Sequence, residues 1–174
     1  GAAAAYRLAR YRGRFAVLEK SNDVANATTK ANSAIIHAGY DPAPGTQMAR
    51  LNVEGNRQAA EICQKLNVPF RRTGRLVLAF SEEECRTLDE LYRRGVENGV
   101  PDLALLSGAG ARAVEPGLSD QVKAALYAPT AAVVNPWEYA LAMAETAVKN
   151  GVELYLEHPV TAICPVEGGY ALTT

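Results

Sequence analysis

The chain has 174 residues, of which 48% are hydrophobic and 21% charged, and its formal net charge is −1 at pH 7. This length suits one domain, or one domain and part of another, and the composition is that of an ordinary globular protein. The near-zero charge excludes nucleic acid and anionic membrane surfaces as expected partners. The longest apolar runs, such as LVLAF at 76–80, have the length of a strand and are too short to span a membrane.

The cysteines and histidines give no sign of a metal site. The three cysteines are widely separated and form no CxxC motif, which argues against a disulfide framework and favours a reducing cytoplasm. The chain has only two histidines, and no Cys, His and carboxylate residues cluster along it. We therefore expect a cytoplasmic protein without a bound metal ion.

The first part of the chain predicts helices and buried strands around a polar loop. Residues 2–11 are rich in alanine and predict a helix, and the apolar run at 15–18 predicts a buried parallel strand. The polar segment 21–33 predicts a loop with room for one helical turn, and the run at 35–39 predicts a short buried strand. From residue 46 to 66 apolar positions recur every three or four residues, which predicts a long amphipathic helix. These positions are Met48, Leu51, Gly55, Ala59, Ile62 and Leu66.

The middle of the chain predicts a strand at 76–80 and then a helix over about 82–97. Ser81 and Glu84 have the spacing of a capping box, which opens this helix. A loop region follows, and residues 122–129 predict another strand.

The last part begins with a second helix-start signal. Asn135 and Pro136 suit the N-cap and first helical positions of a helix that runs to about residue 150. Strands are predicted at 152–156, 160–164 and 170–174, and the Gly-Gly turn between the last two predicts a hairpin. This order of elements indicates an α/β fold.

Glu19 stands at the end of the strand at 15–18. In a dinucleotide-binding βαβ unit, an acid at this place accepts hydrogen bonds from the adenosine ribose, and the preceding helix begins at the third glycine of GxGxxG, facing the pyrophosphate. If Gly1 is that glycine, Glu19 follows it at close to the usual spacing of about 20 residues. The alternative is a surface glutamate after an ordinary buried strand.

One string carries a more specific signal. ATTKANSAIIHAGYDPAPGTQMARLNVEGN, at 27–56, closely resembles the flavin-contacting segment of FAD-dependent oxidoreductases of the D-amino-acid-oxidase (DAO) superfamily. The branch that it resembles contains glycerol-3-phosphate dehydrogenases and L-2-hydroxyglutarate oxidases. VPFRRTGRLVLAF at 68–80, the segment 125–154 and the strand at 160–163 fit the same branch in the same order. The resemblance covers essentially the whole chain.

The resemblance implies contacts to FAD. It places Gly1 at the pyrophosphate, Glu19 at the adenosine ribose and Lys20 beside the adenine or ribose. Val160 would offer its backbone to the adenine, and the loop beside the pyrophosphate and flavin would contain Thr28, Thr29, Lys30, Asn32 and Ser33. The alternatives are a solvated lysine, a core valine and a plain polar turn.

His37 is the candidate catalytic residue. It follows two isoleucines and precedes Ala38 and Gly39, so we expect it to be partly buried with room for a planar ring beside it. The resemblance allows three roles, namely a covalent or hydrogen-bonded contact to the flavin, a hydrogen bond to the substrate, and a base for the substrate hydroxyl. The alternative is a core histidine satisfied by backbone. His158, before Pro159, reads as a loop residue.

The substrate signal is mixed. The glycerol-3-phosphate enzymes with a clear pattern carry an arginine shortly after the histidine, as a phosphate ligand. Here Asp41 stands there, which favours a 2-hydroxy acid. Anion ligands remain available in Arg50 and in Arg71, Arg72 and Arg75, each with a solvated or structural role as the alternative.

We therefore expect an α/β flavoprotein: a Rossmann-like FAD-binding domain lacking its first strand, over 1–70 and 134–174, and the start of an inserted mixed-sheet substrate domain over 71–133. The protein would oxidise a secondary C–OH of a small anionic metabolite by hydride transfer to flavin N5, in the manner of glycerol-3-phosphate dehydrogenase. L-2-hydroxyglutarate and a glycine- or sarcosine-type amine are the alternative substrates. Quinone, oxygen or a protein would accept the electrons.

The chain reads as an internal fragment, because the resemblance places a strand and two glycines before Gly1 and further segments after Thr174. We therefore expect residues 1–174 alone to bind FAD weakly or not at all. A further alternative is an inactive fragment.

Overall fold

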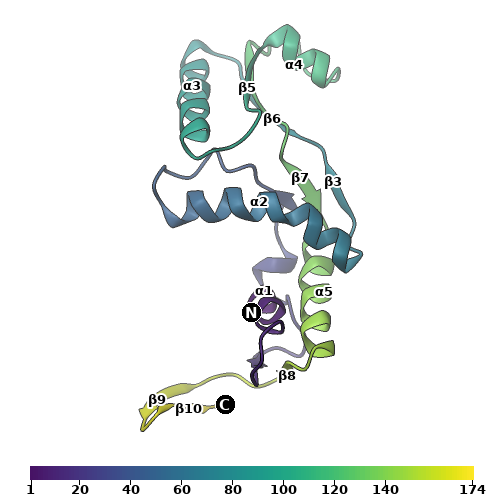
Figure 1. The fold of residues 1–174 in the computed structure, drawn as a ribbon. Coiled ribbons are helices and arrows are strands. Elements are labelled where there is room, and N and C mark those ends of the chain that lie inside the picture. The colour runs from purple at the N-terminus through teal and green to yellow at the C-terminus, as the bar shows by residue number, and fades with distance from the viewer. The chain divides into compact units, whose positions relative to one another are not determined.

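The computed structural model describes residues 1–174, which fold as two compact units (Figure 1). Unit 1 contains Gly1–Ser33, Leu66–Val68 and Asn135–Thr174, and unit 2 contains Ala34–Lys65 and Pro69–Val134. Residues 34–65, which the sequence assigned to the domain of the N-terminus, thus group with the second unit. The assignment of the parts of the chain to cofactor and substrate stays a prediction.

Unit 1 is built on close packing of two helices. Helix α1 (Ala2–Leu8) lies against α5 (Pro136–Lys149), as Figure 1 shows. Their small side chains, Ala5 and Ala147, are buried together with Val152. Strand β1 (Ala16–Leu18) pairs in parallel with β8 (Glu153–Tyr155), which confirms the parallel strand that the sequence predicts.

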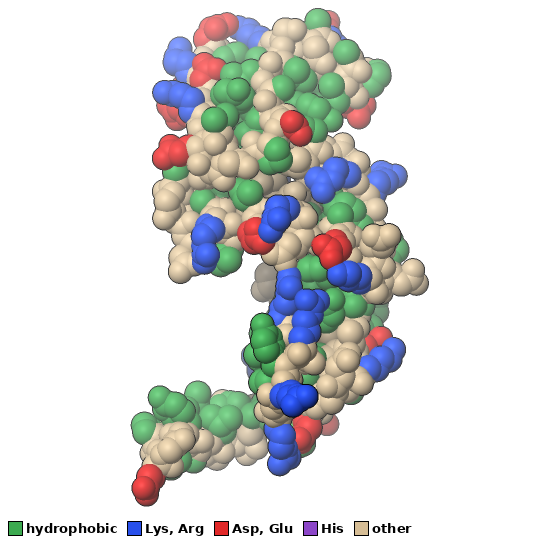
Figure 2. Space-filling model, in the orientation of Figure 1, with side chains coloured by type: hydrophobic (Ala, Val, Ile, Leu, Met, Phe, Trp, Pro, Cys, Tyr) green, Lys and Arg blue, Asp and Glu red, His purple; other side chains and the backbone are tan.

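The end of unit 1 is the predicted hairpin. Strands β9 (Ala162–Val166) and β10 (Gly169–Thr173) pair antiparallel, with Gly169 opposite Val166. Gly168 has a φ of +79°, a left-handed conformation that glycine adopts without strain. Both strands are exposed, and hydrophobic side chains gather on this hairpin at the lower left of Figure 2.

Unit 2 contains two small antiparallel sheets and three helices. The sheet orders are β2-β7-β3 and β4-β6-β5, so β7 and β6 are the central strands. The strands are β2 (Ile35–Ile36), β3 (Phe70–Arg72), β4 (Arg75–Ala79), β5 (Ala104–Ser107), β6 (Ala124–Ala128) and β7 (Ala132–Val134). The helices are α2 (Gln47–Leu66), α3 (Glu82–Glu97) and α4 (Gly108–Val114). The main core joins β6 to α3 through Leu126 and Leu88 and includes Tyr40.

Four elements of unit 2 escaped the sequence analysis: β3, β5, α4 and β7. The strands are three or four residues long, too short for a periodic pattern. Helix α4 has the sequence GAGARAV, in which two glycines lower helix propensity. Its first residue, Gly108, lies against the backbone carbonyl of Val122 so closely that no β-carbon fits. Tertiary contact, which no local pattern records, sets this helix.

Helix α2 has its predicted length, and its buried face shares only Ala59 with the predicted apolar stripe. The residues that face the core are Ala49, Asn56, Ala59 and Cys63. Met48 and Leu51 of the predicted apolar stripe are instead 68% and 56% exposed. Because alanine side chains are short, the buried face lets the helix approach its neighbours closely, and a polar Asn replaces a hydrophobic anchor there.

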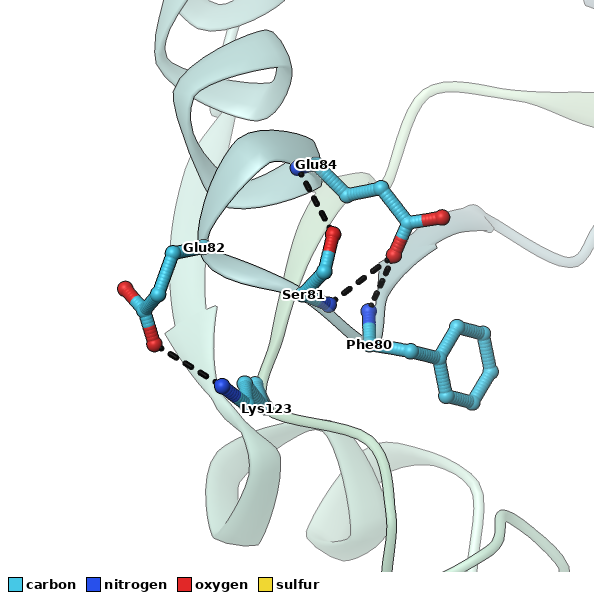
Figure 3. A network of polar contacts seen from close by, with 5 residues as sticks. All are labelled: Phe80, Ser81, Glu82, Glu84 and Lys123. Atoms are coloured by element: carbon cyan, nitrogen blue, oxygen red, sulfur yellow. Dashed lines mark hydrogen bonds and ion pairs between the residues drawn. The ribbon is translucent and has the colours of Figure 1, made fainter.

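The start of α3 is a complete capping box, shown in Figure 3. The Ser81 hydroxyl accepts from the Glu84 N–H at 3.2 Å, and the Glu84 carboxylate accepts from the N–H groups of Ser81 and Phe80 at 3.0 and 2.7 Å. These bonds, that from Phe80 first, lower the pKa of Glu84. Glu82 beside them forms an ion pair with Lys123 at 2.9 Å. The capping box confirms the helix start predicted from the sequence.

The lowered pKa of Glu84 predicts acid sensitivity. Because the ionised form is favoured in the folded state, its stabilising contribution is complete above the ordinary value of 4.5 and is lost as pH falls below it. Glu84→Gln keeps an acceptor oxygen but does not titrate, so the stability of this variant should fall less on acidification. Denaturant unfolding at pH 7 and at acid pH measures the difference. Glu83→Gln, which changes an exposed neighbour outside the box, is the control and should keep the wild-type acid dependence; equal acid dependence in both variants would contradict the prediction.

Candidate functional site

Unit 1 has a cavity of about 240 Å³ between the start of α1, the end of β1 and the loop that follows. Gly1 and Ala2 line it from the helix, and Glu19 and Lys20 line it from the end of the strand. Its other polar lining residues are Ser21, Asn26 and Thr29. The structure thus brings together Gly1, Glu19, Lys20 and Thr29 of the residues predicted from the sequence.

The backbone of Glu19 continues the pairing of β1 with β8. Its N–H donates to the Tyr155 carbonyl, and its own carbonyl accepts from the His158 N–H, both at 2.9 Å. The half-buried carboxylate accepts from the Ser21 N–H at 2.8 Å through Oε1. One oxygen is therefore used to order the loop, and the carboxylate keeps acceptor capacity for a hydroxyl donor, since an ionised carboxylate has about four lone-pair positions.

The predicted cofactor loop contains one short 3₁₀ turn, η1 (Thr28–Lys30). The Asn32 side-chain amide donates to the carbonyls of Thr28 and Thr29, at 3.1 and 2.8 Å, and so holds this turn. Lys30 Nζ donates to Asn26 Oδ1 at 3.1 Å. Thr29 lines the cavity, whereas Thr28, Lys30, Asn32 and Ser33 are exposed outside its lining. Of this loop, Thr29 is the residue that the cavity includes.

Val160 lies just before the hairpin of β9 and β10 and is 43% exposed, outside the cavity lining. The next residue, Thr161, donates its N–H to the Thr173 carbonyl at 2.8 Å. The sequence alternative of a core valine is therefore wrong, and the predicted backbone contact to adenine stays a prediction.

His37 belongs to unit 2 and is exposed, not partly buried as the sequence predicted. Strand β2 ends at Ile36, and the chain then turns so that Ala38, Gly39 and Tyr40 enter the core in its place. Gly39 makes this turn with a φ of +111°, where a β-carbon would come within 2.6 Å of the Val53 side chain. The His37 ring is therefore on the surface of the unit, beside Arg75.

Two partners of His37, Arg75 and Asn56, were not predicted from the sequence. Arg75 Nη1 lies 3.1 Å from His37 Nδ1. Asn56 is 7% exposed, and its Nδ2 donates to the carbonyls of His37 and Thr130 at 2.9 Å each. Both contacts join residues far apart in the chain, so no motif signals them. The one available hint was that Asn56, a polar residue, stands among the apolar positions of the predicted helix.

The cavity suits one part of a dinucleotide. A carboxylate at the end of a parallel strand accepts hydrogen bonds from ribose hydroxyls, and backbone N–H groups at the start of a helix satisfy phosphate oxygens. Glu19 and Gly1 stand at these two places around one cavity, and Lys20 lines it beside Glu19. The described residues contain no group of three His, Cys, Asp or Glu side chains placed for a metal ion. None of the helices is both long and apolar enough to cross a membrane.

Comparison with known proteins identifies the family. The family model "FAD dependent oxidoreductase" (DAO) matches residues 1–174. The chain belongs to this family. Over its whole length it is 48% identical to the glycerol 3-phosphate dehydrogenase of Caloramator mitchellensis, and it spans 36% of that enzyme. The mitochondrial L-2-hydroxyglutarate dehydrogenase of Nematostella vectensis is 31% identical over 89% of the chain, which spans 34% of that enzyme.

The fold also matches a solved structure of the family. Dithionite-reduced L-α-glycerophosphate oxidase from Mycoplasma pneumoniae, with FAD bound, superposes with a TM-score of 0.92 at 30% identity. The match covers 98% of this chain and 46% of that one. The α/β fold, the family and the FAD cofactor predicted from the sequence are therefore confirmed.

Asn56 should contribute strongly to the free energy of unfolding, because its one side-chain amide donates to two carbonyls. Asn56→Leu has a similar volume but leaves the carbonyls of His37 and Thr130 without their donor, and should cost about 1–3 kcal/mol of the free energy of unfolding. Denaturant unfolding measures this loss. Gln64→Leu, the same change of an amide on the exposed face of α2, is the control and should shift stability by less than about 0.5 kcal/mol. Equal effects of the two substitutions would contradict the bridging role.

Proposed function

We propose that this chain is part of an FAD-dependent dehydrogenase or oxidase that oxidises the secondary alcohol of a small anionic metabolite, with glycerol 3-phosphate as the first candidate. The observation that carries the proposal is the match to a glycerol 3-phosphate dehydrogenase at 48% identity over all of the chain. The cavity that combines Glu19 with Gly1 and Lys20 supports the cofactor part of the proposal.

In this proposal unit 1 holds the adenosine end of FAD. Glu19 accepts hydrogen bonds from the ribose hydroxyls, and its backbone pairing with β8 keeps the carboxylate at the cavity. Gly1 faces the pyrophosphate, and Lys20 lies beside the adenine or ribose. Further cofactor contacts, from Thr28, Lys30, Asn32, Ser33 and Val160, extend the site beyond the cavity. When bound, FAD would supply a two-electron acceptor for the hydride that leaves the substrate carbon.

His37 is the proposed contact to the substrate oxygen. Oxidation of an alcohol removes a hydride from carbon and a proton from the hydroxyl. A group beside the hydroxyl oxygen is therefore needed to hold that oxygen in position. Nδ1 of His37 is already in contact with Arg75. The exposed ring therefore offers its other nitrogen, Nε2, to a ligand. In this role His37 orients the substrate hydroxyl.

L-2-hydroxyglutarate is the second candidate substrate, and a specific residue favours it. Asp41 stands where the clearest glycerol-3-phosphate enzymes carry an arginine for the phosphate. A carboxylate does not bind phosphate, whereas the exposed Arg71 of the same unit could bind an anion of either kind.

The proposed location is a reducing cytoplasm, which the three unpaired cysteines suit. Quinone, oxygen or another protein takes the electrons.

The substrate test uses the whole protein with its flavin under anaerobic conditions. Glycerol 3-phosphate should bleach the flavin absorbance, whereas glycerol, which lacks the anion, should not. Bleaching by L-2-hydroxyglutarate alone would select the second candidate. A protein purified without flavin, or a flavin that neither compound reduces, would contradict the proposal.

The cofactor site predicts a specific role for Glu19. Glu19→Ala removes the acceptor for the ribose hydroxyls and should weaken FAD binding in the whole protein about 10-fold or more, as expected for a lost hydrogen bond to a charged group. Titration of the apoprotein with FAD, followed by flavin fluorescence, measures the change. The matched control is Glu167→Ala, which removes an exposed carboxylate at the hairpin turn and should leave the affinity unchanged.

A further inference from the structure

The contact between Arg75 and His37 fixes the position of a proton. Arg75 Nη1 lies 3.1 Å from His37 Nδ1. A guanidinium group has five N–H donors and no acceptor, so the ring nitrogen that it contacts must accept through its lone pair. In a neutral imidazole whose Nδ1 accepts, the proton is on Nε2. The arrangement therefore selects one of the two histidine tautomers.

We propose that Arg75 is a positioning residue that holds His37 as the Nε2–H tautomer, so that His37 donates a hydrogen bond to the substrate oxygen. The identity of the acceptor rests on the proposed function, whereas the tautomer does not. This donor role replaces the role as a base that the sequence also allowed, because Nδ1 is occupied and Nε2 already carries the proton.

Both residues are held by their backbones. The His37 carbonyl accepts from Asn56, a buried side chain. Arg75 begins β4 and pairs with Ala128 of β6. Before it, Gly74 has a φ of +68°, and a β-carbon there would come within 2.8 Å of the Tyr127 ring. The two side chains thus start from fixed points, which lowers the entropy cost of keeping their contact.

The charge of Arg75 acts beyond its contact with His37. The bond between the two side chains is exposed, although the Arg75 residue is partly buried. Burial raises the pKa of Tyr40, and the charge of Arg75 acts against that increase. The guanidinium therefore lies close enough to Tyr40 for its charge to act there, in addition to its contact with His37.

The chemical consequence concerns the substrate oxygen. As the hydroxyl proton leaves and the hydride transfers, negative charge develops on that oxygen, and a fixed N–H donor stabilises it. An imidazole locked by Arg75 provides such a donor without reorientation during the reaction. The hydroxyl proton then passes to a water molecule, which takes the place of a protein base in this step.

The second histidine provides a natural comparison. His158 Nδ1 lies 2.6 Å from the Leu156 carbonyl oxygen. A carbonyl only accepts, so this Nδ1 carries the proton and Nε2 has the lone pair. The two histidines are therefore expected in opposite tautomers, each set by its neighbour.

The first experiment is nitrogen-15 NMR of the imidazole rings in the whole protein, with each signal assigned by its loss in His37→Gln or His158→Gln. At neutral pH, His37 should show a protonated Nε2 and a bare Nδ1, and His158 the reverse. In Arg75→Met the His37 signals should shift toward a mixture of tautomers, with His158 unchanged. The control is Arg71→Met, which changes an exposed arginine of β3 and should leave both rings unchanged. A protonated Nδ1 on His37, or signals that ignore Arg75→Met, would overturn the proposal.

The second experiment separates donor from base by kinetics with the substrate that reduces the flavin. His37→Gln keeps an N–H donor but cannot take a proton, whereas His37→Leu has neither. Donation predicts that the Gln variant retains at least about 10-fold more kcat than the Leu variant, whose loss should be about 100-fold or more. Equal losses in the two variants would refute the donor role.

Arg75→Met should lower kcat with little change in KM; a rise in KM alone would make Arg75 a substrate ligand and refute its positioning role. If no substrate is found, the proposed function fails, while the NMR result still decides the tautomer.

Discussion

The buried amide of Asn56 is the interaction on which unit 2 depends. Its single NH₂ group donates to two carbonyls at 2.9 Å, that of His37, 19 positions earlier, and that of Thr130, 74 positions later. Buried carbonyls that lack a donor are costly, so helix α2, the end of β2 and the turn before β7 keep their mutual positions. The backbone of the candidate catalytic residue is set by this amide, and the ring is set from the other side by Arg75.

Close packing of small residues plays the corresponding part in unit 1. Ala5 and Ala147 bring α1 and α5 together, and β1 pairs in parallel with β8 beneath them. Helix α1 begins and strand β1 ends at the same cavity. Gly1 and Glu19 therefore both line it, although they are well separated in the sequence. A larger side chain at either alanine would separate the helices and alter the cavity.

The two candidate sites have different chemistry, and this difference fits the family. Around Glu19 the groups suit a ribose and phosphates, which are features of the cofactor shared by all members. Around His37 the groups are an exposed imidazole ring and the guanidinium of Arg75, which would suit the oxygen atoms of an anionic substrate. Asp41, shortly after His37 in the sequence, is the residue by which the chain departs from the phosphate-binding pattern that the resemblance implies. Substrate choice is therefore expected to depend on unit 2 more than on the cofactor cavity.

The sequence by itself determined the long elements and the family. Helix α3 was predicted because a capping box opens it, α2 because twenty residues carry one period, and the last hairpin because a Gly-Gly turn separates two apolar runs. Glu19 was found because a motif spacing connects it to Gly1. Only the tertiary structure decided strands β3, β5 and β7, the buried face of α2, the exposure of His37 and its contact with Arg75. The physical reason is range: caps, turns and periods act within about one or two helical turns, whereas Asn56, Arg75 and the β7 pairings join residues that are distant in the chain.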